Sequence, residues 1–180
     1  MEVEVKILEV DPSRVIEKME GVGARLIFSG DILTLYYDSP DGVIAKRRDL
    51  LRLRRVGDRS EITYKRFVSS VDLKIREEYE TDVGSIEQLD KILGCLGFVE
   101  TEKVVKKRVS YKTPNARVDI DVHLEKYSYI PPFLEIESDS KENIVELAGK
   151  LGYSDRDFKT LDFFDLAKYY PLRKEPSIPP

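Results

Sequence analysis

The sequence opens with Met1-Glu-Val-Glu-Val-Lys-Ile7, and this stretch decides how the rest of the chain is interpreted. Side chains alternate between the two faces of a β-strand. The two glutamates and the lysine would therefore share one face, and the aliphatic residues would share the other. An ordinary half-buried strand also turns a polar face to water, but this kind of charged face returns in strand after strand of the chain.

Length and composition limit the possible classes of protein. The 180 residues suffice for one domain with a full core or for two small ones. Charged residues make up 36% of the chain, above the usual quarter, yet the net charge is only −4. This near-balance disfavours a generic nucleic-acid binder, which would have a basic excess.

We expect a cytoplasmic protein without a membrane partner. The first residues are charged, so no signal peptide is expected, and no apolar run approaches membrane-spanning length. The single cysteine, Cys95, excludes an internal disulfide framework. The oligomeric state is not fixed by the sequence, and a homodimer through an outer sheet edge is compatible with it.

Local signals predict an α+β chain. Capping residues, apolar spacing and terminal Gly or Pro predict helices at 12–21, 85–96, 141–151 and 160–170. Alternating patterns predict about eight antiparallel strands. They are 1–7, a hairpin of 24–29 and 32–38 that turns at Gly30-Asp31, and then 50–56, 61–68, 74–83, 102–112, 116–123 and 133–137. We expect a single domain over residues 1–172 and a Pro-rich tail over 173–180.

The polar faces of these strands carry charges of both signs. They offer Glu2, Glu4, Lys6, Arg52, Arg54, Thr63, Lys65, Arg76, Glu78, Glu80, Lys106, Arg108, Asp119, Asp121, Glu135 and Glu137. Like charges two residues apart on a strand lie about 7 Å apart, which costs stability unless a ligand or counter-ion neutralises them. An open sheet with a solvated face explains any single strand. The whole set instead favours a closed eight-stranded barrel with helices outside, whose lining binds a multiply charged anion together with a divalent cation.

Several motifs, in order, resemble those of the CYTH superfamily, the triphosphate tunnel metalloenzymes. Glu2-x-Glu4-x-Lys6 is similar to the N-terminal signature of that family. The later landmarks are Tyr36-Tyr-Asp38-Ser-Pro, Leu51-Arg-Leu-Arg54, Lys65, Arg76-x-Glu78-x-Glu80, Lys106-x-Arg108, Asp121, Phe133-Leu-Glu-Ile-Glu137, and Leu151-Gly152 followed by Lys159-Thr-Leu. The resemblance spans residues 2–170. The superfamily includes class IV adenylate cyclases, thiamine triphosphatases and tripolyphosphatases.

The resemblance implies roles for individual residues. Mg²⁺ or Mn²⁺ would be bound by Glu2, Glu4, Asp121, Glu135 and Glu137. The triphosphate would be bound by Lys6, Arg52, Arg54, Lys65, Arg76, Lys106, Arg108 and Lys159. The catalytic residues would be Glu4, Asp121 and Lys65.

Three functions follow from these residues. The favoured one is metal-dependent hydrolysis of a triphosphate-containing small molecule, which needs positioning and charge neutralisation more than covalent help. The alternatives are a class IV adenylate cyclase that forms cyclic AMP and pyrophosphate, and a non-catalytic polyphosphate or nucleotide sensor. We expect the single histidine, His123, to have a structural role at the end of its strand.

Overall fold

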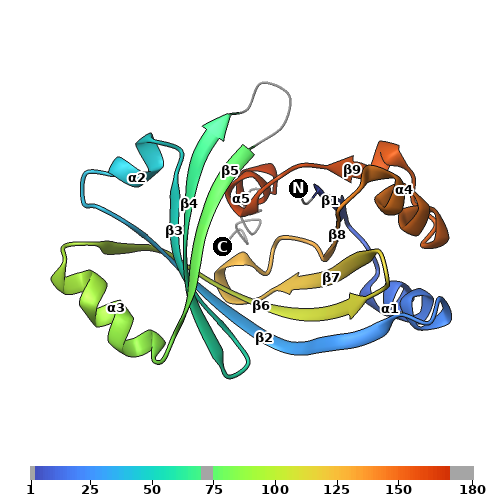
Figure 1. Cartoon of the computed structure of the whole chain (residues 1–180), viewed down its shortest axis with the longest axis horizontal. Coiled ribbons are helices and arrows are strands. Elements are labelled where there is room, and N and C mark those ends of the chain that lie inside the picture. Colours follow the sequence, from blue (N-terminus) through green and yellow to red (C-terminus); the bar gives the residue numbers. More distant parts are fainter. Residues whose placement is uncertain (1–2, 70–74, 171–180) are drawn as a thin grey trace, which may run out of the picture. The chain divides into compact units, whose positions relative to one another are not determined.

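The computed structural model describes residues 3–69 and 75–170, and its elements are labelled in Figure 1. The chain forms two compact units. Unit 1 comprises Met1–Gly30 and Lys106–Pro180, and unit 2 comprises Asp31–Val105. None of the described helices is long and apolar enough to cross a membrane.

Nine strands form the sheet, in the hydrogen-bonded order β5-β4-β3-β2-β6-β7-β8-β1-β9. Their bounds are β1 (Val3–Leu8), β2 (Arg25–Asp38), β3 (Leu50–Val56), β4 (Arg59–Ser69), β5 (Ile75–Val83), β6 (Val99–Lys112), β7 (Ala116–His123), β8 (Phe133–Ser138) and β9 (Phe158–Lys159). The helices are α1 (Pro12–Gly21), α2 (Val43–Lys46), α3 (Ile86–Cys95), α4 (Lys141–Lys150) and α5 (Phe163–Tyr169), with 3₁₀ turns η1 (Glu125–Tyr127) and η2 (Asp155–Asp157). The α+β class with a large antiparallel sheet is thus confirmed.

The predicted eight-stranded closed barrel needs correction in its strand number, and its closure is not confirmed. Within the described residues the strand order has two ends, β5 and β9. The additional strand, β9, is two residues long and pairs Phe158 with Ile7 and Lys159 with Lys6. A strand this short has no alternation pattern of its own, so only the pairing with β1 defines it.

The predicted hairpin at Gly30-Asp31 is wrong, because β2 continues through both residues. A two-residue hairpin requires a positive φ in its turn, and neither residue has one. A Cβ on Gly30 would lie 3.3 Å from the ring of Phe28, so the glycine gives that ring room on an extended strand. As a result, β2 runs through both units, as β6 also does.

Unit 1 packs α1 and α4 against one face of its strands. The buried core includes Ile7 and Leu134 from the sheet, Met19 from α1 and Ile144 from α4. Helix α1 begins where Asp11 accepts hydrogen bonds from the backbone N–H groups of the first turn. Because this face is apolar, the charged residues of the same strands lie on the opposite face.

Unit 2 packs α2 and α3 against β2 and β3. Its core includes Leu35, Leu53, Ile44 and Leu93. Helix α2 is missing from the sequence predictions because its four residues are too few to show a helical repeat. It forms because the carboxylate of Asp38 accepts hydrogen bonds from Ile44 N and Ala45 N at 2.8 and 2.9 Å.

Candidate functional site: two charged clusters

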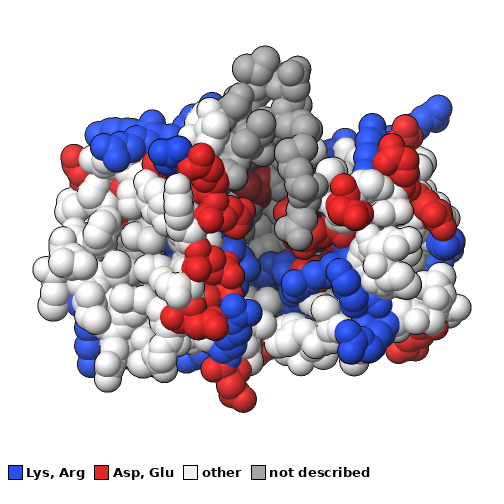
Figure 2. Space-filling view, viewed as in Figure 1, with Lys and Arg blue, Asp and Glu red and all other residues white. Residues whose placement is uncertain are grey.

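Strand register gathers charged residues on the face of unit 1 opposite its core. We call them the carboxylate cluster: Glu4, Lys6, Lys106, Arg108, Asp119, Asp121, Glu135 and Glu137. They come from β1, β6, β7 and β8, and directly paired positions share a face. Figure 2 shows lysine and arginine side chains beside aspartates and glutamates on the face in view. Period-two alternation predicted which residues share this face, and only the pairing defines their neighbours.

Arg108 is the most heavily bonded cation of the carboxylate cluster. Its guanidinium donates from Nε and Nη2 to the two oxygens of Asp121, each at 2.6 Å, and from Nη1 to Asp119 at 2.5 Å. Its Nη2 lies 3.6 Å from Glu135. The side chain is only 8% exposed, so these carboxylates supply the pairing that a buried charge requires.

Asp121 is fully buried and bonded through both oxygens. Lys106 Nζ donates to its Oδ2 at 2.6 Å, in addition to the two bonds from Arg108. Although burial opposes it, these two cations hold the pKa of Asp121 well below its usual range. Asp121 is therefore ionised and, in this structure, orients two cations. Its predicted role as a metal ligand stays a prediction.

Lys6 contacts two carboxylates of the same cluster. Its ammonium donates to Glu4 and lies 3.5 Å from Glu135. Burial alone would lower the pKa of this lysine, but Glu135 and Glu4 outweigh that effect and raise it. The raised pKa of Lys6 shows that the electrostatic potential in this part of unit 1 is negative.

Glu4 experiences the same negative potential with the opposite result. Burial and the nearby charge of Glu135 raise the pKa of Glu4, and its partner directly across the strands is another carboxylate, Glu137. Glu135 keeps its charge, because Lys6 and Arg108 overcome burial and lower its pKa to about 2. Three carboxylates thus occupy adjoining positions, and one of them, Glu4, combines a raised pKa with a side chain that is 48% exposed.

A second group of charges, the arginine cluster, occupies one face of β3, β4 and β5 in unit 2. It comprises Arg52, Arg54, Glu61, Thr63, Lys65, Glu78 and Glu80. Direct pairing places Arg52 opposite Thr63 and Arg54 opposite Glu61. Glu78 and Glu80 lie opposite Lys65 and Thr63 on the next strand. Glu61 is a buried member of this face that the sequence analysis missed, although its parity with Thr63 and Lys65 could have identified it.

The two arginines of this cluster share long ion pairs. Arg52 Nη2 lies 3.9 Å from Glu61 and from Glu80, and Arg54 Nη1 lies 3.8 Å from Glu61. These distances are near the limit of an ion pair and exceed the range of a charge-assisted hydrogen bond. Arg52, whose Nε also donates to Thr63 at 3.2 Å, is therefore paired with its carboxylates at longer distances than Arg108 with Asp121.

Lys65 is the lysine of this second cluster, and its pKa is shifted. It donates to Glu78 at 2.5 Å, and its side chain is 19% exposed. Burial and the neighbouring charge of Arg52 nevertheless lower its pKa, with a smaller contribution from Arg54. Burial is the largest of these causes, so the anion-binding character of this cluster rests on its groups: Arg52, Arg54 and Lys65 share one face and offer positive charge to an anion.

The CYTH domain family model matches residues 1–158. The chain belongs to the CYTH family. This match confirms the resemblance that the sequence motifs indicated. A Methanocaldococcus jannaschii protein named “Putative adenylate cyclase MJ0240” is 26% identical over 151 residues, which are 81% of this chain and 84% of that protein.

Solved structures show the same fold. The PH1012 protein of Pyrococcus horikoshii is 26% identical, with a TM-score of 0.74 over 92% of this chain and 99% of that one. A Hippeastrum protein named as an adenylyl cyclase and described as having a dominant triphosphatase activity has a TM-score of 0.71 at 16% identity, over 96% of this chain and 98% of that one. At that identity the likeness concerns the fold alone.

Three predicted site residues of this CYTH protein are not members of the two clusters. Lys159 is exposed on β9, directly opposite Lys6. Glu2 lies outside the described residues. Arg76 is placed in β5 opposite Phe67, but its side chain also lies outside the described part.

His123 is buried beside the carboxylate cluster. Its ring lies 5.6 Å from that of Phe133 and 5.8 Å from that of Phe163, on α5. Burial, with the nearby charge of Lys106, lowers the pKa of His123 to about 4. The imidazole is thus neutral near pH 7 and packs against these rings, and its buried Nδ1 has no hydrogen-bond partner among the described residues. Its structural role stays a prediction.

The carboxylate cluster has the oxygen donors that a hard divalent cation needs, but these donors are not arranged around a common point. In the described residues no group of three or more His, Cys, Asp or Glu side chains is arranged to hold a metal ion. The oxygen donors of Glu4, Glu135 and Glu137 are nonetheless the type that Mg²⁺ and Mn²⁺ prefer. Burial and the neighbouring Glu135 raise the pKa of Glu4, so a cation bound there would relieve the repulsion between these carboxylates.

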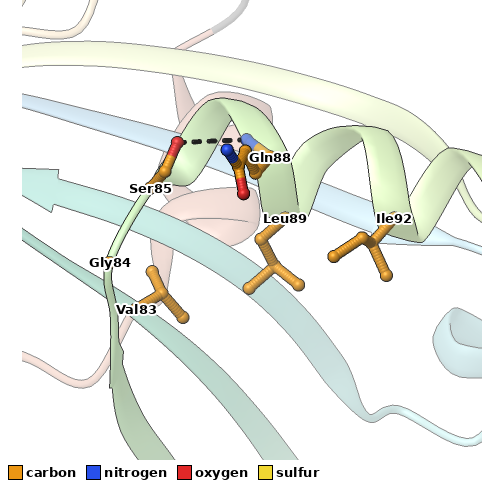
Figure 3. A pocket seen from close by; sticks show the side chains of 6 residues that line it. All are labelled: Val83, Gly84, Ser85, Gln88, Leu89 and Ile92. Carbon is orange, nitrogen blue, oxygen red and sulfur yellow. Dashed lines mark hydrogen bonds between the residues drawn. The ribbon is translucent and has the colours of Figure 1, made fainter.

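A pocket of about 440 Å³ in unit 2 does not match this chemistry (Figure 3). It is lined by Val83, Gly84, Ser85, Gln88, Leu89 and Ile92, around the start of α3. The figure also shows the hydrogen bond by which Ser85 caps the helix at Gln88 N, 3.2 Å long. No side chain in this lining is charged, so the pocket offers nothing to a metal or a triphosphate.

Proposed function

We propose that this CYTH protein is a divalent-metal-dependent enzyme that binds a triphosphate and hydrolyses it. The supporting observation is the composition of the two charged clusters, in which carboxylates surround the buried Lys6 and two arginines share the face of Lys65. The pKa of Lys6 is raised beside carboxylates, and the pKa of Lys65 is lowered beside arginines. One cluster is thus suited to a cation and the other to an anion, and a metal-triphosphate complex carries both charges.

The metal would be Mg²⁺ or Mn²⁺, held by Glu4, Glu135 and Glu137. When bound, it would neutralise charge on phosphate oxygens, as divalent ions do in phosphoryl transfer. Glu2 is a further proposed ligand on the same strand as Glu4. Asp121 would join the ligands only by giving up bonds from Lys106 and Arg108, so we assign it the orientation of these two cations.

Each unit offers cations of its own to phosphate oxygens. In unit 2 these are Arg52, Arg54 and Lys65, whose ion pairs with Glu61, Glu78 and Glu80 would be exchanged for phosphate contacts. Lys6, Lys106 and Arg108 are held by carboxylates in unit 1. Arg76 and Lys159 complete the proposed set. Arginine suits this task because its planar guanidinium can bind two phosphate oxygens at once.

Two groups would act on the reacting atoms. Glu4, as a proposed metal ligand, would orient the attacking water beside the metal. The lowered pKa of Lys65 makes its ammonium a better donor to the leaving phosphate oxygen. The reaction needs no covalent nucleophile, because positioning and charge neutralisation supply most of the catalysis.

The test is release of phosphate from tripolyphosphate, ATP and thiamine triphosphate, with Mg²⁺, Mn²⁺ or a chelator. We expect metal-dependent release that falls roughly 100-fold in Glu4→Gln, since the variant loses several kcal/mol of charge stabilisation. Glu77→Gln is the matched control. This glutamate pairs with Arg66 and is 46% exposed, close to the 48% of Glu4.

Cyclic AMP and pyrophosphate are measured in the ATP reactions. The cyclase alternative is supported by the name of the Methanocaldococcus relative, and formation of both products would establish it in place of hydrolysis. Tight triphosphate binding without turnover of any substrate would leave a sensor. Equal activity of Glu4→Gln and the unmodified protein would contradict the proposed role of the carboxylate cluster.

A further inference from the structure

A small pocket lies beside the carboxylate cluster and carries a different chemistry. It has a volume of about 230 Å³ and lies wholly in unit 1, between the end of β1, the segment after α4, β9 and the end of α5. Its lining includes Tyr153, Tyr169 and Tyr170, two cations, Arg156 and Lys159, and Glu9. Three aromatic rings and two cations around one cavity are the groups that bind a planar ring attached to a phosphate.

The two cations of the pocket are available to a ligand. Arg156 and Lys159 are both exposed and form no ion pair within the described residues. The two anions in the lining are already bonded. Glu9 Oε1 accepts a hydrogen bond from Tyr170 Oη at 2.7 Å, and Asp157 accepts from Ser154. The lining thus carries two cations and two carboxylates, and Arg156 and Lys159 are its side chains that can bind a phosphate.

The wall that carries the tyrosines is held in place from two sides. Helix α5 buries Leu166 and accepts at the carbonyl of Ala167 a hydrogen bond of 3.1 Å from Tyr129. The rings of Tyr169 and Tyr170 lie 4.9 Å apart at 80° to each other. Tyr169 is nevertheless 57% exposed, so its surface is open to a ligand.

Glu9 supplies the opposite wall in an unusual backbone conformation. Its φ is 58°, in the left-handed region that costs energy for a residue with a Cβ. This turn ends β1 and brings the carboxylate to Tyr170. Such strain persists where the surrounding structure imposes it, and it is frequent beside ligand sites.

Lys159 connects the pocket to the carboxylate cluster. It is paired directly opposite Lys6, whose ammonium is bound to Glu4 and Glu135. Directly paired residues on antiparallel strands have Cβ atoms about 5 Å apart on the same face. Phosphates bound at the cluster would therefore place a group attached to them within reach of the pocket.

We propose that this pocket binds the heteroaromatic ring of an organic triphosphate, with Tyr169 as the ring-stacking residue and Lys159 at the adjoining phosphate. The proposal rests on the function proposed above and narrows its substrate to organic rather than inorganic triphosphates. The cavity is smaller than the roughly 300–1,000 Å³ that encloses a whole drug-sized ligand. It therefore takes one ring system and leaves the phosphates outside.

Binding of ATP, thiamine triphosphate and tripolyphosphate is measured by calorimetry in the presence of a chelator, so that no metal-dependent turnover interferes. We expect Tyr169→Leu to weaken the binding of ATP about tenfold, the effect of losing one stacked ring. Tripolyphosphate affinity should change less than twofold. Tyr169→Phe should keep both affinities, because it keeps the ring.

Tyr79→Leu is the matched control, since Tyr79 is 59% exposed on β5 and lies outside the pocket lining. Melting temperatures of all variants establish that each is folded. A loss of thiamine triphosphate affinity as large as that of ATP would show a general ring pocket. A loss confined to one of the two ligands would identify its ring as the one recognised.

The proposal is overturned if Tyr169→Leu keeps ATP affinity within twofold, or if it weakens ATP and tripolyphosphate equally. Failure of all three ligands to bind the unmodified protein, both in the chelator and with Mg²⁺, would instead remove the proposed function and this inference with it. If the unmodified protein binds tripolyphosphate and Tyr169→Leu leaves ATP affinity unchanged, only the ring-binding role of the pocket is contradicted and the proposed function stands.

Discussion

Lys6 and Lys65 are two lysines of similar burial in chemically opposite surroundings. Their side chains are 10% and 19% exposed, and each contacts a glutamate. The pKa of Lys6 is raised because Glu135 and Glu4 together outweigh its burial. The pKa of Lys65 is lowered because burial and Arg52 outweigh Glu78. A salt bridge by itself thus says little about local potential, which depends on every charge that faces the group.

Exchanging each lysine for methionine should give the largest difference between the two clusters. Lys6→Met leaves Glu135 and Glu4 short of a partner, and we expect the free energy of unfolding to fall by about 3 kcal/mol. Lys65→Met should cost less than about 1 kcal/mol, because Glu78 is half exposed and the repulsion from Arg52 is relieved. Urea unfolding of both variants at pH 7 measures this, and equal losses would contradict the assigned potentials.

Divalent cations should act on the carboxylate cluster with the next largest effect. At one hundred times its dissociation constant, Mn²⁺ should stabilise the unmodified protein by about 2.7 kcal/mol, by mass action on the folded state. Glu137→Gln should abolish most of this gain, while Glu77→Gln keeps it. Thermal unfolding with Mn²⁺ and with a chelator tests both. Equal stabilisation of the two variants would place the cation elsewhere.

The pH dependence of stability should single out His123. Its pKa is lowered from 6.5 to about 4 in the folded state, so the unfolded chain binds a proton first as the pH falls. The stabilisation is therefore present above about pH 6.5 and lost below it. Between pH 7 and pH 5 the loss should be about 2 kcal/mol.

Urea unfolding in a chelator at several pH values measures this loss. His123→Gln has no titrating imidazole and should show a flatter profile between pH 7 and pH 5. Carboxylates contribute mainly at lower pH, since the pKa of Glu135 in the folded state is about 2. An unchanged slope in the variant would assign the pH dependence to other groups.

The smallest expected effect concerns the like charges around Glu4. Without metal, Glu4→Gln removes a charge opposite Glu137 and beside Glu135, while Lys6 keeps Glu135 as a partner, so stability should rise by about 0.5 kcal/mol. Glu78→Gln in the arginine cluster should instead lower stability by a similar amount, because Lys65 loses its partner. Denaturation in a chelator compares the two, and changes of the same sign would weaken the contrast between the clusters.

Most helices and strands, the family and most members of the charged faces can be predicted from the sequence alone. Period-two alternation places Glu4 with Lys6 and Arg52 with Arg54 whatever their partners are. Caps such as Asp11 and Ser85 predicted helix starts because they act within a few residues. These features depend on local geometry alone, which the order of residues specifies.

Only the tertiary structure decided what each charged residue faces. Strand register placed Glu4 opposite Glu137 and enclosed Asp121 between Lys106 and Arg108. The continuous β2, the strand β9 and the pocket beside Tyr169 depend likewise on partners distant in sequence. Burial and Coulomb interactions act through space, and so the sign of a pKa shift follows from the fold and not from the residue's own segment.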